Sequence, residues 1–173
     1  MKWTFCGLGF MVFLFTGLKA QGSNTISPSN ERSAMLEYYT TQGVTTDPGK
    51  YEDLYKELPD DVHGLVQAVT GLLMHEAHLA AYKVELTEER KSELQLRRVE
   101  DMLEKIMTLD EHSLVTPRAP GKRLIVDCRH FTVLACSFLR SKGIPARARC
   151  GFGGYFQPGI YSDHWICEYW DST

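Results

Sequence analysis

The sequence lacks the features that usually mark nucleic-acid-binding, zinc-binding or redox proteins. Its formal net charge is −3, so it carries no basic field, and a nucleic acid is not expected as a main partner. Five cysteines are scattered along the chain without a Cys-x-x-Cys pair, which argues against a zinc knuckle and against a dithiol redox motif. There is also no internal repeat, and the 173 residues are enough for one domain with a sizeable core.

Three further ligand motifs are incomplete. His75 and His78 are three residues apart, whereas the His-Glu-x-x-His zinc motif needs a spacing of four, so a structural or surface role is expected for both. The glycines at 151–154 lack the Gly-Lys and the following helix of a phosphate loop. No loop of oxygen ligands indicates calcium. Neither a metal nor an organic cofactor is therefore expected.

Long hydrophobic runs are missing except at the start of the chain. Residues 3–18 are mostly apolar and follow Lys2, and small residues at Ala20 and Gly22 suit a cleavage site. This layout predicts a secretory signal peptide over residues 1–22, and the run is shorter than the ~20 residues of a membrane span. We therefore expect a secreted or periplasmic protein without a stable membrane span after cleavage. The alternative is a cytoplasmic protein whose translation starts at Met35.

The remainder alternates between polar connections and periodic segments. Residues 23–33 are polar and include Pro28, which predicts a linker ahead of one domain over residues 34–173. Helical spacing of apolar residues, with plausible caps, predicts short helices at 34–39 and 51–58 and long ones at 62–82 and 87–109. The charge run at residues 88–91 is expected to be a solvated face. Strand periodicity follows at 147–152 and 161–170, with a loop at 153–159, so the fold class is α+β.

One segment between these helices and strands has a complete set of helix signals. Asp127 is a good N-cap, Gly143 suits the left-handed position after the last turn, and Pro145 prevents continuation. Between them, one apolar face has helical spacing and comprises Phe131, Leu134, Ala135, Phe138 and Leu139. Cys128 is thus predicted at the first helical position.

A cysteine at that position is a candidate nucleophile. The helix N-terminus is expected to lower the pKa of its thiol toward neutrality, and the thiolate is the reactive form. His164, on a separate predicted strand, can reach the sulfur as general base and later as general acid. His130 cannot face Cys128 from the same helix, because residues i and i+2 diverge, and it is expected to be partly exposed.

The motifs Asp-Cys-Arg-His-Phe, Leu-Arg-Ser-Lys-Gly-Ile-Pro-Ala-Arg and His-Trp-Ile-Cys-Glu-Tyr together resemble the transglutaminase-like superfamily of papain-like thiol enzymes. Within it, the chain is similar to a bacterial branch of transglutaminase-like domain proteins. The sharp motifs cover residues 126–169, and a looser likeness extends back to about Met35. The resemblance implies a papain-like α+β fold, with a helical N-terminal layer, the nucleophile helix and then antiparallel strands. It also implies catalysis by Cys128 and His164.

The chain departs from the superfamily pattern in two respects. The acid that orients the histidine usually lies on the following strand. Glu168 and Asp171 would be roughly 13 and 23 Å along the strand from His164, and Asp163 points to the opposite face. We therefore expect the third residue beyond Thr173, in a sequence truncated at its C-terminus. The second oxyanion donor is also unassigned, since Trp3 lies in the predicted signal peptide and neither Gln67 nor Gln95 has support for the role.

The remaining cysteines and two arginines have less specific interpretations. Cys136 is expected in the core, and Cys150 and Cys167 are expected as two reduced core thiols on neighbouring strands, although they could pair in an oxidising compartment. Arg147 and Arg149 are expected to be exposed strand residues, the alternative being attraction of a substrate carboxylate.

The sequence thus predicts a thiol acyltransferase or amide hydrolase. Cys128 would attack a protein or peptide amide, and the thioester would pass to an amine or to water. The alternative is a binding module of the same fold that has lost catalysis. The sequence leaves the substrate and the oligomeric state open.

Overall fold

The computed structural model describes residues 3–6 and 28–171. Most of the predicted signal peptide lies outside these residues. The elements occur in the following order: β1 (Trp3–Cys6), α1 (Pro28–Thr40), the 3-10 helix η1 (Gly49–Glu57), α2 (Val62–Leu72), β2 (Leu73–His75), η2 (Glu76–His78), η3 (Arg90–Gln95), α3 (Val99–Leu109), η4 (Pro120–Lys122), β3 (Leu124–Val126), α4 (Cys128–Ser141), β4 (Ala146–Gln157) and β5 (Ile160–Trp170). This is the mixed α+β architecture that the sequence predicts.

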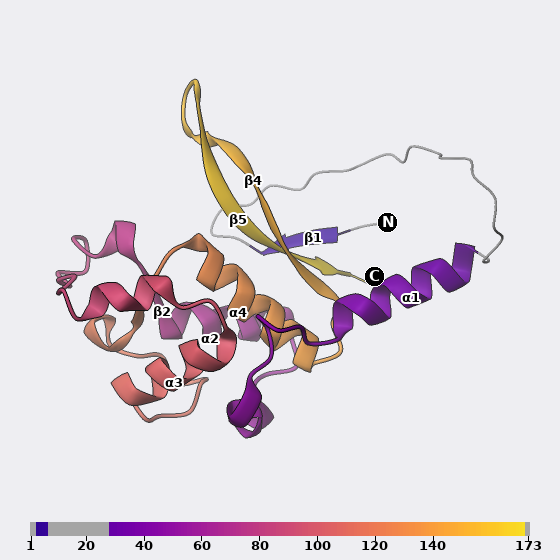
Figure 1. Cartoon of the computed structure of the whole chain (residues 1–173), viewed down its shortest axis with the longest axis horizontal. Coiled ribbons are helices and arrows are strands. Elements are labelled where there is room, and N and C mark those ends of the chain that lie inside the picture. The colour runs from indigo at the N-terminus through magenta and orange to yellow at the C-terminus, as the bar shows by residue number, and fades with distance from the viewer. Residues whose placement is uncertain (1–2, 7–27, 172–173) are drawn as a thin grey trace.

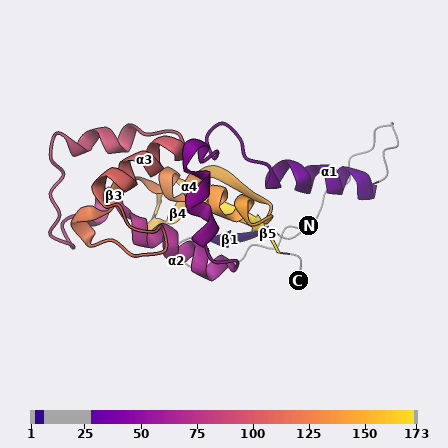
Figure 2. The same cartoon turned by 90° about the horizontal axis from the view of Figure 1, so that it is seen from below.

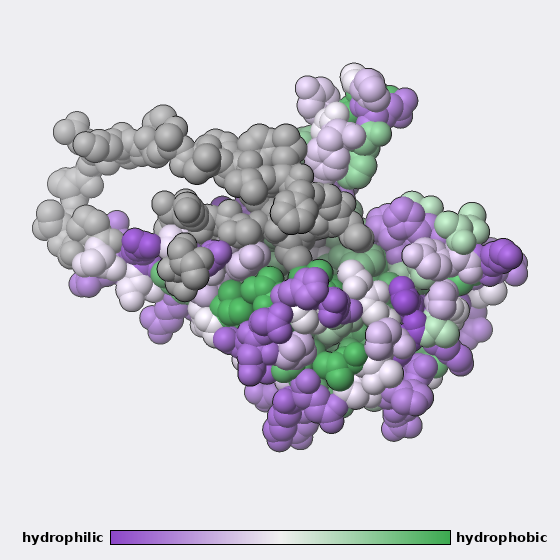
Figure 3. All heavy atoms as spheres, turned by 180° about the vertical axis from the view of Figure 1, so that it is seen from behind, coloured by the Kyte–Doolittle hydropathy of each residue, from purple (hydrophilic) through white to green (hydrophobic). Residues whose placement is uncertain are grey.

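The described residues form two small sheets. The antiparallel sheet has the order β1-β5-β4, and the second sheet is the parallel pair β2-β3. Helices α2, α3 and α4 form the body of the molecule, and the β4–β5 hairpin extends away from it (Figure 1). The view from below shows α1 projecting from the body on the side away from α3 (Figure 2). In the space-filling view the hairpin tip stands clear of the remaining surface (Figure 3).

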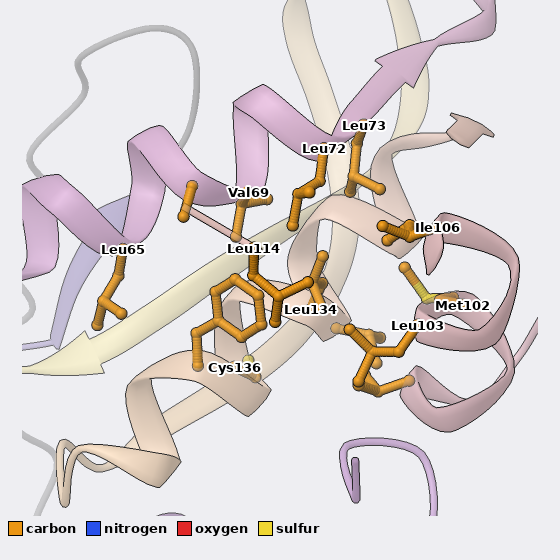
Figure 4. Packing of buried hydrophobic residues seen from close by; sticks show 14 of the residues in the cluster. Leu65, Val69, Leu72, Leu73, Met102, Leu103, Ile106, Leu114, Leu134 and Cys136 are labelled. Atoms are coloured by element: carbon orange, nitrogen blue, oxygen red, sulfur yellow. The ribbon is translucent and has the colours of Figure 1, made fainter. Parts of the chain in front are cut away.

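Helix α4 is the central element of the core. Its predicted bounds are confirmed: Asp127 is the N-cap and Gly143, with φ +71°, follows the last turn. Leu134 and Phe138 on its apolar face are fully buried and pack with residues of α2 and α3 (Figure 4). Burying side chains of this size contributes about 1.5–3 kcal/mol each, so this face fixes α4 within the body.

The predicted helix over 62–82 is wrong beyond Leu72. The chain turns extended at Leu73, and Leu73–His75 pairs in parallel with Leu124–Val126. Leu73 and Met74 are buried on this short strand. An apolar run reads alike as buried helix or buried strand, and here pairing with a distant segment decides for the strand.

The predicted helix over 87–109 is confirmed only over Val99–Leu109, because the chain before it forms η3 and an extended connection. The buried carboxylate of Glu93 accepts a hydrogen bond from the Ile125 N–H at 2.8 Å. The N–H of Val99, which opens α3, donates to the Thr45 carbonyl at 2.9 Å. The Val99 N–H is thereby used outside the bond to the Gln95 carbonyl that a continuous helix would make, and Glu93 ties η3 to β3.

Two boundaries differ from expectation at the ends of the domain. Helix α1 begins at Pro28, inside the predicted linker and upstream of the predicted 34–39 helix. The hairpin strands are longer than predicted, so most of the predicted 153–159 loop is strand, and the turn lies at Pro158 and Gly159, whose φ is +78°. A bulge between Gly153 and Gln157 interrupts the register, and alternation is hard to recognise across such a site.

Arg90, expected on a solvated face, instead neutralises the buried Glu93. Its guanidinium donates to both carboxylate oxygens, at 2.8 and 2.9 Å, and to the Gly121 carbonyl at 3.1 Å. Glu93 is fully buried, and Lys105 is a second cation 3.8 Å away. This pair connects η3 to the segment that leads into β3.

We predict that Arg90→Ala lowers the free energy of unfolding by about 3 kcal/mol, because it leaves a buried carboxylate without its bidentate partner. Urea unfolding followed by circular dichroism measures this. Lys91→Ala is the matched control, since the Lys91–Glu88 pair is exposed. Equal unfolding midpoints for the two variants would contradict the assignment.

Candidate functional site

The start of α4 is fixed by its N-cap. Asp127 accepts a hydrogen bond from the Arg129 N–H at 2.9 Å, which leaves Cys128 at the first helical position as predicted. Partial burial raises the pKa of the Asp127 carboxyl, but His130 and Arg129 act in the opposite sense and hold it below its usual value. Asp127 is therefore a carboxylate at neutral pH.

His130 is buried, which corrects the prediction of a partly exposed residue. It is 2% exposed, and its Nδ1 lies 2.7 Å from the Asp127 carboxylate. The Asp127 N–H donates to the same Nδ1 at 3.3 Å, which completes a capping box, and the Arg129 guanidinium lies 3.2 Å from Nε2. Burial lowers the pKa of His130, so the ring is neutral at pH 7. Its place three residues after the cap, where Glu or Gln completes a capping box, was the missed sequence signal.

The surroundings of Cys128 change the pKa of its thiol in opposite directions. Partial burial raises the pKa of the thiol, as do the carboxylates of Asp127 and Asp163, whereas the N–H groups of Trp165 and Arg129 lower it. The net direction is upward, so the expected shift toward neutrality is wrong. Two backbone donors at a helix start do not outweigh desolvation and two nearby negative charges.

His164 lies on β5, opposite Gly151 of β4. Its neighbours along the strand, Asp163 and Trp165, both act on the Cys128 sulfur, so β5 brings this segment to the start of α4. Among the residues that the structure describes, no hydrogen bond joins the His164 ring to Cys128. Cys167, three residues further along β5, contacts α4, and strand alternation directs His164 to the other face.

On that face the His164 ring packs against aromatic residues of the hairpin. Its centroid lies 4.9 Å from the Phe156 ring and 6.2 Å from the Tyr155 ring, both edge-on. Burial lowers the pKa of His164, although Asp163 raises it. The imidazole is therefore neutral at pH 7 and able to accept a proton.

His75 lies at the same end of the body. It ends β2 opposite Val126, and its ring stacks on Phe131 of α4 at 6.2 Å. Its Nδ1 accepts from the Ala77 N–H at 3.1 Å, so the neutral ring carries its proton on Nε2. Burial lowers the pKa of His75, and so do the charges of His78 and His164, while Glu76 and Asp127 raise it. The capping role is structural, as expected, but the position of His75 beside α4 could not be predicted, because it depends on the pairing of β2 with β3.

Both arginines of β4 pair with a buried carboxylate; Arg149 is exposed, as expected, whereas Arg147 is only partly exposed. Arg147 and Arg149 both donate to Glu168, the latter at 2.8 Å, and Glu168 is 1% exposed. Glu168 is therefore ion-paired with the two arginines, in line with the expectation that it does not orient His164.

Gln67, considered above as an oxyanion donor, has no contact with Cys128 among the described residues. Its side chain bonds to His63 at 2.9 Å on an exposed helix surface.

The cysteines are only partly as predicted. Cys136 and Cys167 are core residues, but Cys150 is exposed, and the residue opposite it on β5 is Trp165.

Within the described ranges no group of three His, Cys, Asp or Glu side chains is arranged to hold a metal ion. In the same ranges, no helix has the length and apolar character needed to cross a membrane. A shallow hollow between η1 and α3, lined by Tyr51, Leu54 and Met107 among others, does not include the site.

Comparison of the chain with protein-family models, with curated proteins and with solved structures finds no match.

We predict that iodoacetamide modifies Cys128 more slowly than Cys150 at pH 7.5, because a raised pKa reduces the thiolate fraction. The rate at Cys128 should still be rising above pH 9. Mass spectrometry of digested protein measures each site over a pH series, with Cys150 as the exposed internal reference. Faster labelling of Cys128 at pH 7.5, or a plateau below pH 8, would show a depressed pKa instead.

Proposed function

We propose that the chain is a transglutaminase-like thiol acyltransferase or amide hydrolase of papain-like type, with Cys128 as nucleophile and His164 as general base. The observation that carries this proposal is the approach of the Asp163–Trp165 segment to a cysteine at the capped start of a helix. A protein or peptide amide is the proposed substrate.

The pKa directions favour a neutral thiol and a neutral imidazole over an ion pair. Burial raises the pKa of Cys128 and lowers that of His164, and both shifts oppose transfer of the proton before substrate binds. In the proposed reaction His164 accepts the thiol proton as sulfur bonds to the carbonyl carbon. It then protonates the departing amine as the carbon–nitrogen bond breaks, leaving a thioester. An amine or a water molecule attacks the thioester and regenerates the thiol.

This mechanism requires the His164 ring to move toward the sulfur. Catalytic hydrogen bonds are often long or misaligned in unliganded enzymes and tighten when substrate binds. The ring now rests against Phe156 and Tyr155 of the β4–β5 hairpin, which projects from the body (Figure 1). A rotation of the side chain or a twist of the hairpin is the proposed closing step.

For the oxyanion we propose the Cys128 N–H as one donor and His75 as the second. The reason is the protonation state of His75: its Nδ1 is occupied by the Ala77 N–H, so Nε2–H is left as a donor. A pKa below the usual histidine value keeps the ring in this neutral form at pH 7. A neutral imidazole donor of this kind stabilises developing negative charge without itself transferring a proton.

A binding module without catalysis is the second candidate. The raised pKa of the Cys128 thiol and the orientation of His164 away from the sulfur favour this alternative. The two candidates differ in whether the sulfur accepts an acyl group with help from His164.

We predict that p-nitrophenyl acetate at pH 7.5 acetylates Cys128 and that hydroxylamine removes the acetyl group. His164→Ala should slow acetylation by about 10²-fold or more, because general-base catalysis contributes about that much. His78→Ala is the matched control, since His78 is an exposed neighbour of the site. Peptide mass spectrometry locates the acetyl group. Acetylation at Cys150 alone, or a rate at Cys128 unaffected by His164→Ala, would favour the binding module.

A further inference from the structure

Two buried sulfurs are in contact in the main hydrophobic core, where α4 packs on β5. The Sγ atoms of Cys136 on α4 and Cys167 on β5 lie 3.4 Å apart. The two residues are 0% and 1% exposed and belong to the main hydrophobic core (Figure 4 shows Cys136). Neither residue has a part in the proposed reaction.

We propose that Cys136 and Cys167 form a disulfide bond that ties the nucleophile helix to the histidine strand. An S–S bond is about 2.05 Å long, so the sulfurs need to approach by only about 1.4 Å. One sulfur is on α4 and the other on β5, and these two elements already pack against each other. The required movement is therefore within the range of side-chain adjustment.

Among the thiols whose side chains the structure describes, Cys128 and Cys150 are less well placed for the same bond. Cys150 is exposed and has Trp165 opposite it, whereas the residue opposite Cys167 on β4 is Ala148. Cys128 is at the first turn of α4 and faces the Asp163–Trp165 segment. Cys6 is the residue opposite Cys167 on β1, and it is the competitor that a test has to distinguish.

The chemistry needs a disulfide donor, and oxidised glutathione is sufficient. One protein thiolate attacks the glutathione disulfide, forms a mixed disulfide and releases one glutathione. The second protein thiolate attacks that mixed disulfide and releases another. Two protein thiols are thereby oxidised and one glutathione disulfide is reduced to two glutathiones. Because both sulfurs are buried, the exchange takes place during folding or local opening of the hairpin.

The two cysteines are 31 positions apart, and the bond would close a loop that contains β4 and the part of β5 up to Cys167, His164 included. Restricting the unfolded chain in this way stabilises a protein of this length by a Tm shift on the order of 10 °C. It would also hold β5 against α4 three residues from His164, independently of whether the site is catalytic.

The test is refolding of the full chain from urea in a glutathione buffer rich in the disulfide form. Residual thiols are then alkylated, and the protein is mapped by non-reducing peptide mass spectrometry. We expect a peptide linked through Cys136 and Cys167, alkylated Cys128 and Cys150, and a Tm that falls by several degrees on reduction. Cys150→Ser should retain the link and the Tm difference, and Cys136→Ala should lose both.

Alkylation of both Cys136 and Cys167 after refolding, or a link of Cys167 to Cys6 or Cys150, would overturn the proposal. Because the link is read directly from peptides of the parent chain, a variant that folds poorly does not obscure the result. The readout also does not depend on acyl transfer, so the bond and the proposed activity can fail separately.

Discussion

The packing of α4 along β5 is the constraint on which the rest of the molecule depends. At one point it places Cys136 against Cys167 in the core, and at another it places the Trp165 N–H at the Cys128 sulfur. The start of the helix is fixed by the contact between Asp127 and the buried ring of His130. Helix position and strand position are therefore set by one continuous core.

Where α4 packs on β5, desolvation has the largest effect on the pKa values of the site residues. The start of a helix favours an anion, yet the half-buried thiol of Cys128 has a raised pKa because burial and two carboxylates outweigh the backbone donors. Burial also lowers the pKa values of His75, His130 and His164, so all three rings are neutral at pH 7. A site of neutral groups suits proton transfer during attack rather than a resident thiolate.

Sequence reasoning located the features that depend on local signals. The cap, helix and stop around Cys128 and the hairpin that follows could be predicted because each has nearby residues that determine it. The break after Leu72 could not, since it depends on pairing with a strand about 50 residues away. The burial of Arg90 with Glu93, the opposition of Cys136 and Cys167 and the place of His75 likewise arise from tertiary contacts. Nor does alternation along β5 reveal which face meets α4.

The most direct test of the central claim is a crystal structure of the protein with Cys128 carboxamidomethylated, because this adduct places an amide next to the sulfur. We expect the His164 ring to leave Phe156 and Tyr155 and one of its nitrogens to come within about 3–4 Å of the sulfur or the amide. A ring that stays on the opposite face of β5, with the hairpin unchanged, would contradict a shared catalytic site of Cys128 and His164.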